Sequence, residues 1–265
     1  MNIHTPVHFT DNYLINPLNP ITVNLIGAGG TGSQMLTALA RINHSLIALN
    51  HAGLQVAVFD DDVITEANLG RQLFAGAELG LNKAVVLTSR TNRFFGSNWK
   101  AVTRRFDGVL SDPFKAANIY ISCVDTAVAR FEIAKVLKVE AERNRYNRDK
   151  PLYWMDCGNS QNTGQVILST ISQIKQPVSK LYNAVSELPM ITDEYGQLLT
   201  KSEKENNTPS CSLAEALEKQ DLFINSTLAN MAASLLWNLF RQGFTENRGF
   251  FLNLKDFRCS PVKVL

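Results

Sequence analysis

A glycine-rich turn between two apolar segments constrains the fold of this chain more than any other feature. The turn reads Gly27-Ala28-Gly29-Gly30-Thr31-Gly32-Ser33; the apolar run 21–25 precedes it, and residues 34–40, which contain no helix breaker, follow it. A strand, a G-x-G-x-x-G turn and a helix are together typical of a nucleotide-phosphate loop. Small residues let the backbone approach a phosphate, and the helix N-terminus offers free N–H groups and a positive dipole end. Such a turn can also bind nothing, but the fourth glycine, Gly30, and the flanking pattern favour nucleotide binding.

Further apolar runs alternate with helical segments, which predicts a doubly wound, Rossmann-like α/β fold with a mostly parallel sheet. Strands are expected at residues 54–59, 100–105, 118–123, 152–155 and 165–171. Helices are expected at 82–94, 127–145 and 225–240, after a first helix that runs to about residue 49. Two short segments near the end of the chain, 249–253 and 262–265, predict a C-terminal β-hairpin.

The chain is expected to form an N-terminal arm and one domain. Residues 1–20 are polar and proline-rich, which favours an arm, and residues 21–265 form the domain. Within the domain, residues 175–212 are polar and contain Pro177, Pro189 and Pro209. A connection of this length inside a compact domain is usually functional or mobile. We therefore expect a mobile crossover loop at 175–212.

Composition excludes several classes of protein. The net charge of +2 gives no reason to expect a nucleic-acid partner, and no stretch has the length of a membrane span or the pattern of a secretory signal. The four cysteines, Cys123, Cys157, Cys211 and Cys259, form no C-x-x-C pair. Neither a structural zinc site nor a disulfide framework is therefore expected. A cytoplasmic protein with reduced thiols fits best.

Acidic residues follow two of the predicted strands. Asp60, Asp61 and Asp62 come directly after strand 54–59, where a Rossmann-like site binds ribose, and Asp125 follows strand 118–123. Because carboxyl ends of parallel strands meet at one edge of a sheet, Asp125 should face the same crevice as Asp60. The acid triplet can also be a solvated strand end or a helix cap.

Cationic and amide side chains come close behind the acids. Asn68, Arg71 and Gln72 follow within a segment that can fold back over the glycine turn, and Lys83 lies in the first turn of a predicted helix. A lysine there is disfavoured by the helix dipole unless an anion lies beside it. The segment thus predicts a triphosphate site, although a single lysine is more commonly a surface residue.

Together these motifs resemble the ThiF/MoeB and ubiquitin-activating enzyme superfamily, and most of all the ThiF-type proteins of bacterial PRTRC gene clusters. The similarity spans residues 21–171 and is carried by the glycine turn, the spacing Asp60-x-Asp62 to Asn68-x-x-Arg71-Gln72, and Lys83. Cys123-Val124-Asp125-Thr126 with Arg130, and Asp156-x-Gly158 with Gly164, also match. The D-x-D and N-x-x-R-Q spacing after such a turn is more specific than either part alone.

The resemblance implies an adenylation domain at residues 21–265 that uses ATP and Mg²⁺ to adenylate the C-terminal glycine of a ubiquitin-like β-grasp protein, releasing pyrophosphate. It implies that the turn, with Gly27, Gly29, Gly30, Gly32 and Ser33, binds the phosphates. Asp60 would bind the ribose hydroxyls within a nucleotide site that also includes Asp62. Arg71 and Lys83 would neutralise the charge on the phosphates, and Asp125 would hold Mg²⁺. Asn68 and Gln72 would position the nucleotide by hydrogen bonds.

The resemblance also implies partners. A β-grasp carrier protein is expected, for protein modification or for sulfur transfer, and a homodimer is expected from the resemblance and from the apolar helix 225–240. That helix can alternatively be buried in its own core. Homodimeric relatives commonly extend an N-terminal arginine into the partner's site, and residues 1–20 contain none. The position after Asp125, often asparagine, is Thr126.

Two other function classes stay open. One is an NAD-dependent Rossmann oxidoreductase, which Asp60 alone does not exclude because both nucleotides carry a ribose 2′-hydroxyl. Arg71 with Lys83 favours ATP, since hydride transfer has little need of two cations near the phosphates. The other is a non-catalytic nucleotide-binding module that docks a partner.

Cys211 is the candidate for a second chemical step. The segment Pro209-Ser210-Cys211-Ser212-Leu213 resembles the P-x-C-[ST]-[LI] segment around the thioester cysteine of ubiquitin-activating enzymes. Ser212 is a good N-cap, so Cys211 is expected just before a helix N-terminus, where the dipole favours the thiolate. Many relatives stop at the adenylate, however, and a buried cysteine is usually a small hydrophobic residue.

Overall fold

The structure, a computed structural model, describes residues 5–107, 116–205 and 220–265. Its parallel strands are β2 (Ile21–Ile26), β3 (Leu54–Phe59), β4 (Lys100–Val102), β5 (Ile119–Ser122) and β6 (Tyr153–Asn159), and its antiparallel strands are β7 (Thr163–Thr170), β10 (Asn247–Asn253) and β11 (Arg258–Lys263). They form one sheet in the order β11-β10-β7-β6-β5-β2-β3-β4. This arrangement confirms the predicted Rossmann-like α/β fold and its C-terminal hairpin, β10 and β11.

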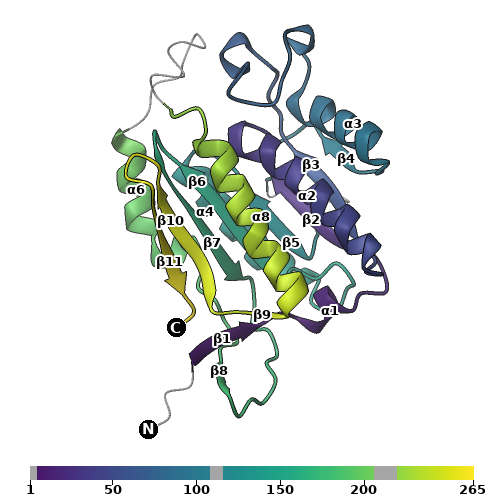
Figure 1. Ribbon diagram of the computed structural model, residues 1–265, viewed down its shortest axis with the longest axis vertical. Helices are drawn as coiled ribbons and strands as arrows, with labels where there is room; N and C mark the ends of the chain where they lie inside the picture. The colour runs from purple at the N-terminus through teal and green to yellow at the C-terminus, as the bar shows by residue number, and fades with distance from the viewer. Residues whose placement is uncertain (1–4, 108–115, 206–219) are drawn as a thin grey trace.

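Helices cover both faces of this sheet (Figure 1). One layer consists of α2 (Gly30–Ala48), α3 (Lys83–Phe95) and α8 (Ile224–Gln242), and the other of α4 (Ala127–Arg143), α5 (Ile191–Glu194) and α6 (Gly196–Glu205). The buried strands alternate between the two layers, as a period of two requires. In β6, for example, Tyr153 and Met155 pack in the layer of α2 and α8, and Trp154 packs in the layer of α4.

The apolar side of α8 is buried within this chain. Leu228, Ala232, Leu236 and Leu239 are each at most 1% exposed, and the helix packs on α2 and on strands of the sheet. The apolar side of α8 is therefore buried in the chain's own core, which was the alternative interpretation of this helix. It gives no separate reason to expect a homodimer. None of the described helices has both the length and the apolarity needed to cross a membrane.

Residues 5–15 of the expected N-terminal arm are folded against the domain. Strand β1 (Thr5–Phe9) lies between β8 (Tyr182–Ala184) and β9 (Phe244–Thr245) in a second, three-stranded sheet, and α1 (Asn12–Ile15) follows it. Val7 and Leu14 are fully buried, which explains why the segment docks although its composition is polar. His8 adds a hydrogen bond of 2.9 Å between its Nε2 and the hydroxyl of Tyr153 in the main sheet.

The expected crossover loop also contains regular structure. Residues 175–205 include β8, α5 and α6, and Met190, Ile191 and Leu199 are buried against the α4 layer. The remaining part of that loop, with Cys211, lies outside the described residues. The third strand is shorter than expected and ends at Val102, whereas β6 continues to Asn159.

Candidate nucleotide site

A cavity of about 480 Å³ lies at the carboxyl ends of the parallel strands. Its position is the switch point of the sheet, where β2 has β3 on one side and β5 on the other, and where open α/β sheets usually bind ligands. The cavity is lined by these residues predicted from sequence: Gly27, Gly29, Gly30, Asp60, Asp62, Arg71, Gln72, Lys83 and Asp125. The fold thus brings together side chains from four separate segments of the chain.

The glycine turn wraps tightly against the end of β5. Gly27 has a φ of 92°, and a Cβ there would lie 2.7 Å from the carbonyl oxygen of Cys123; a Cβ at Gly32 would lie 1.9 Å from the carbonyl oxygen of Gly27. Gly32 and Ser33 do not line the cavity: Gly32 serves this close packing, and the hydroxyl of Ser33 donates to the carbonyl of Gly30 at 3.0 Å. Gly29 is the N-cap of α2 and offers no side chain that would occupy the first free N–H groups.

The N-termini of four helices border the cavity. They are represented among its lining residues by Gly30 of α2, Lys83 of α3, Thr126 as the N-cap of α4, and Asn225 of α8. Each helix N-terminus carries unpaired N–H groups and the positive end of a dipole. The backbone around the cavity is therefore suited to an anion such as a phosphate chain.

Asp60 is held rigidly beside the glycine turn. Its Oδ2 accepts a hydrogen bond from the backbone N–H of Ala28 at 2.6 Å, and its Oδ1 accepts one from the N–H of Asp62 at 2.9 Å. Burial raises the pKa of Asp60 above its ordinary value, although the two hydrogen bonds act in the opposite direction. The carboxylate is thus fixed in orientation and retains lone pairs for a ligand hydroxyl.

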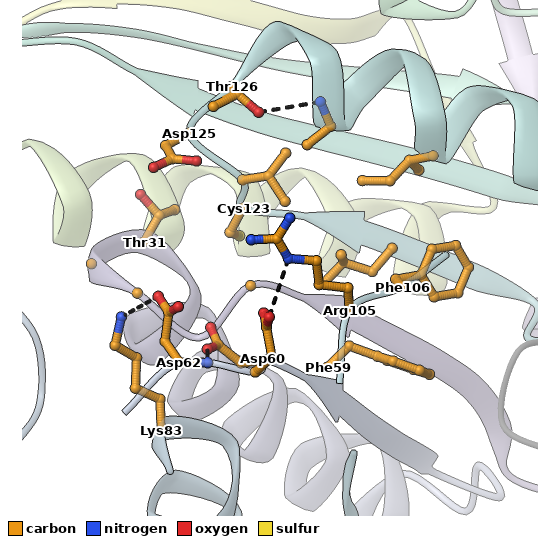
Figure 2. A pocket seen from close by; sticks show the side chains of 18 of the residues that line it. Thr31, Phe59, Asp60, Asp62, Lys83, Arg105, Phe106, Cys123, Asp125 and Thr126 are labelled. Atoms are coloured by element: carbon orange, nitrogen blue, oxygen red, sulfur yellow. Dashed lines mark hydrogen bonds and ion pairs between the residues drawn. The ribbon is translucent and has the colours of Figure 1, made fainter. Parts of the chain in front are cut away.

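Lys83 and Arg71 bring two cations to the cavity. Nζ of Lys83 lies 2.8 Å from Oδ2 of Asp62, and the lysine side chain is only 8% exposed (Figure 2). Arg71 donates from Nη1 to the neutral Oε1 of Gln220, while its buried Nε has no partner. Among the described residues Arg71 forms no ion pair, and burial lowers its pKa. A half-buried guanidinium without a carboxylate is an arrangement that an anionic ligand would complete.

The two predicted amides behave differently. Gln72 lines the cavity and is 7% exposed, and its buried Oε1 has no hydrogen-bond partner. Asn68 does not line the cavity. Its Oδ1 accepts from the N–H and the hydroxyl of Thr65 at 2.9 and 3.2 Å, which closes the short 3₁₀ helix η1 (Glu66–Asn68). Oδ1 of Asn68 therefore caps its own turn, and a hydrogen bond from Asn68 to the nucleotide stays a prediction.

Asp125 faces Lys83 and the acid cluster from the opposite wall (Figure 2). Its loop is held by the buried side chain of Arg130, which donates to the carbonyls of Val124 at 2.7 Å and Thr126 at 3.0 Å. Nε of Arg130 in turn donates to both carboxylate oxygens of Asp156 at 3.0 Å. Arg130 thus fixes the residues on both sides of Asp125, which leaves that carboxylate exposed toward the cavity.

A carboxylate of this kind suits Mg²⁺. The ion is usually bound in proteins by one or two carboxylates together with substrate phosphates and water. A further carboxylate group, Asp60, Asp61 and Asp62, has oxygens within 4.8 Å of one another, but Lys83 pairs with Asp62 and Arg105 with Asp61. Asp125, for which no cationic partner is found among the described residues, is the better match to the donor set that Mg²⁺ prefers.

Several lining residues were not predicted from sequence. Arg105 lines the cavity and its Nε lies 3.1 Å from Oδ2 of Asp61, and Phe106 packs edge-to-face on Phe59 with ring centroids 5.2 Å apart (Figure 2). The only sequence signal for them was their position at the end of the predicted strand 100–105. Gln220 and Asn225, which also line the cavity, carried no signal because they come from the far side of the crossover connection. The cavity lining thus combines charged side chains with the aromatic side chains of Phe59 and Phe106.

The fold is similar to those of two proteins of known structure, PaaA and MccB. The crystal structure of PaaA gives a TM-score of 0.60 at 13% identity and covers 92% of this chain and 73% of the PaaA chain. The structure of Escherichia coli MccB gives 0.58 at 17% identity and covers 93% of this chain and 63% of MccB. MccB with ATP gives 0.54 at 16% identity, with coverage of 93% and 64%. This chain thus spans under two thirds of the length of MccB, and at these identities the similarity is one of fold.

A search of curated protein sequences returned no match. The model of the ThiF family, in contrast, matches residues 8–263, a range that includes every lining residue of the cavity. The match includes the glycine turn and the acid cluster, and it also includes α8, which lies outside the residues 21–171 covered by the sequence motifs. The superfamily resemblance is confirmed at this level: the chain belongs to the ThiF family.

Proposed function

We propose that this protein is an ATP- and Mg²⁺-dependent adenylyltransferase that activates the C-terminal glycine of a ubiquitin-like β-grasp protein. The observation that carries the proposal is that one cavity joins the glycine turn, the cations Arg71 and Lys83, and the carboxylates Asp60 and Asp125. The aromatic side chains Phe59 and Phe106 line the same cavity and lie apart from Lys83 (Figure 2). A nucleoside triphosphate, with a charged chain and a flat base, matches this lining. Membership of the ThiF family supports ATP-dependent adenylyl transfer.

In this proposal each group of the cavity has one task. The phosphates lie along the turn from Gly27 to Gly30, and Asp60 accepts hydrogen bonds from the ribose hydroxyls. Arg71 and Lys83 neutralise charge on the phosphates, and the free Oε1 of Gln72 is available to position a donor. Asp62 holds Lys83 in place.

The chemical step is transfer of AMP to a carboxylate. An oxygen of the carrier's C-terminal carboxylate attacks the α-phosphorus, the bond from that phosphorus to the bridging oxygen breaks, and pyrophosphate leaves. Asp125, with its loop fixed by Arg130, would hold Mg²⁺ against the phosphates. When bound, the ion supplies positive charge that stabilises the leaving pyrophosphate.

The solved structures of MccB include complexes with ATP and with MccA. They support ATP as the nucleotide and a separate partner molecule as the acceptor. Placement among the PRTRC-type members, and a β-grasp carrier as that partner, belong to the proposal. The genes encoded beside this one would test both: a neighbouring ubiquitin-like protein or isopeptidase indicates protein modification, and a cofactor-synthesis operon indicates sulfur transfer.

The experiment that tests the nucleotide assignment is a titration of the protein with ATP and Mg²⁺ and, separately, with NAD. We expect binding of ATP, and ATP–pyrophosphate exchange once the cognate carrier is added. Tight binding of NAD without binding of ATP would identify an oxidoreductase instead. ATP binding without exchange in the presence of carrier would favour the non-catalytic docking module.

A thioester on Cys211 is proposed as a second step, in which the thiolate attacks the acyl-adenylate and AMP leaves. Among the described cysteines, Cys157 is fully buried, and its hydrogen bond with Cys123 together with burial raises its pKa, which makes it a poor nucleophile. After incubation with carrier, ATP and Mg²⁺, a non-reducing gel should show a thiol-sensitive adduct. The adduct should be absent in Cys211→Ala and present in the control Cys259→Ala, while exchange survives in both. An adduct that persists in Cys211→Ala would exclude this step.

A homodimer is proposed from the family resemblance alone. Light scattering that gave a monomer of 29.4 kDa at high concentration would contradict it. The missing N-terminal arginine has a candidate replacement within the chain, since Arg105 already lines the cavity.

A further inference from the structure

Arg71 is held by a chain of neutral side chains that no sequence motif predicted. The hydroxyl of Thr31 donates to Oδ1 of Asn225 at 2.9 Å, and Nδ2 of Asn225 donates to Oε1 of Gln220 at 3.0 Å. The same Oε1 accepts from Nη1 of Arg71. Thr31 and Asn225 are 4% and 3% exposed, so the first half of the chain is buried. The network therefore connects the turn that would bind phosphates with the arginine that would neutralise them.

The first turns of two long helices build this network. Thr31 is the second residue of α2 and Asn225 is the second residue of α8, and the two helices pack on each other. A Cβ at Gly30 would lie 2.6 Å from Cγ and Oδ1 of Asn225, so the amide lies directly against the glycine turn. The two hydrogen bonds fix the orientation of the Asn225 amide, because Oδ1 faces the donor Thr31 and Nδ2 faces the acceptor Gln220.

The partner of Arg71 at position 220 is a neutral amide and not a carboxylate, which matters for phosphate binding. A carboxylate at this position would form an ion pair with Arg71 and would compete with a ligand phosphate. The amide oxygen instead orients the guanidinium and leaves its charge uncompensated. Nε of Arg71, buried and without a partner, is then left for an incoming oxygen acceptor.

We propose that Gln220 and Asn225 are positioning residues that orient Arg71 toward the β- and γ-phosphates of the nucleotide. The proposal rests on the proposed function, because it takes the cavity to bind ATP. Neither residue is assigned a contact with the reacting atoms; both act through Arg71. Their effect should consequently depend on the phosphates beyond the α-phosphate and on the presence of Arg71.

Calorimetric titration of the full-length protein with Mg²⁺ and ATP, ADP or AMP tests this. In Gln220→Ala we expect about tenfold weaker binding of ATP, since a hydrogen bond to a charged group is lost, and little change for AMP. Gln220→Glu should weaken ATP binding further than Gln220→Ala, because the new carboxylate pairs with Arg71. Asn230→Ala changes an exposed amide on α8 whose Nδ2 donates to the carbonyl of Ser226 on the same helix; it is the control and should bind all three nucleotides as the wild type does.

A double-mutant cycle separates positioning from a general structural effect. In the Arg71→Ala background, Gln220→Ala should have no further effect on ATP binding if it acts through Arg71. Asn225→Ala should behave in the same way; because Asn225 is buried, its thermal unfolding is measured alongside, and the Gln220 pair decides the question if this variant does not fold.

Two results would overturn the proposal while leaving the proposed function intact. One is equal loss of ATP and AMP binding in Gln220→Ala, and the other is an undiminished effect of Gln220→Ala in the Arg71→Ala background. Failure of the wild-type protein to bind any of the three nucleotides would overturn the proposed function and this inference together.

Discussion

Lys83→Met and Asp125→Asn are each expected to lower the rate of ATP–pyrophosphate exchange by about a hundred- to a thousand-fold, the usual effect of removing one electrostatic partner of a transition state. Methionine keeps the length of the buried lysine stem while it removes the ammonium that lies 2.8 Å from Asp62. Asparagine keeps the shape of Asp125 and removes its charge. The residual exchange of Asp125→Asn should also depend only weakly on the concentration of Mg²⁺, because the proposed carboxylate ligand is lost.

The matched controls are Lys135→Met and Asp193→Asn, which change side chains on the exposed surface of α4 and on α5, outside the cavity lining. Both should exchange at the wild-type rate. Near-wild-type exchange by Lys83→Met or Asp125→Asn themselves would mean that these residues are ordinary charges at the rim of the cavity and that the assignment of the adenylation step is wrong.

Asp156→Ala is expected to lower the free energy of unfolding by about 3–5 kcal/mol, because it leaves the charge of Arg130 buried without its partner. The Arg130 and Asp156 side chains are 5% and 1% exposed, and Asp156 also accepts from the hydroxyl of Ser122 at 2.6 Å. Urea denaturation would measure the loss, and for a domain of this size the melting temperature should fall by roughly 10 °C. Exchange activity should fall as well, because Arg130 holds the carbonyls on both sides of Asp125.

An exposed ion pair provides the control for this loss of unfolding free energy. Lys138 and Asp193 form a pair at 3.5 Å with side chains 58% and 56% exposed. Lys138→Met should cost under about 1 kcal/mol, as exposed pairs generally do. If Asp156→Ala unfolded at the same urea concentration as Lys138→Met, the buried pair would contribute no more than a surface pair, and its role in fixing the loop of Asp125 would be in doubt.

Local patterns in the sequence were sufficient for the parallel part of the fold. The run Ile21–Ile26, the glycine turn and α2 are contiguous, and the acids after β3 follow from a strand whose ends are marked by composition. The positions of Arg71 and Lys83 in the cavity were predicted for a related reason, since a short segment behind the acids can reach only the nearby carboxyl ends of β2 and β3. Their place at one site follows from the register of parallel strands.

Two features of the structure have physical causes that composition does not report. The docking of residues 5–15 depends on two fully buried side chains, Val7 and Leu14, and on strand pairing with β8 and β9, which lie more than a hundred residues away. Asn68 was expected beside the phosphates, and its Oδ1 accepts two hydrogen bonds from Thr65 within its own 3₁₀ turn. An asparagine that can cap a turn and one that can contact a ligand look alike in a sequence.

The sequence alone determined the fold class, the location of the candidate site, and the acids, cations and glycines that line most of it, because each depends on contacts within one β-α-β unit or on strand ends that meet at one edge. Only the tertiary structure decided what surrounds these groups. The packing of α8 on α2 places Asn225 against the glycine turn and Gln220 against Arg71, and the buried pair of Arg130 with Asp156 fixes the loop of Asp125. These contacts join residues far apart in the chain, and their geometry arises only when the two helical layers close on the sheet.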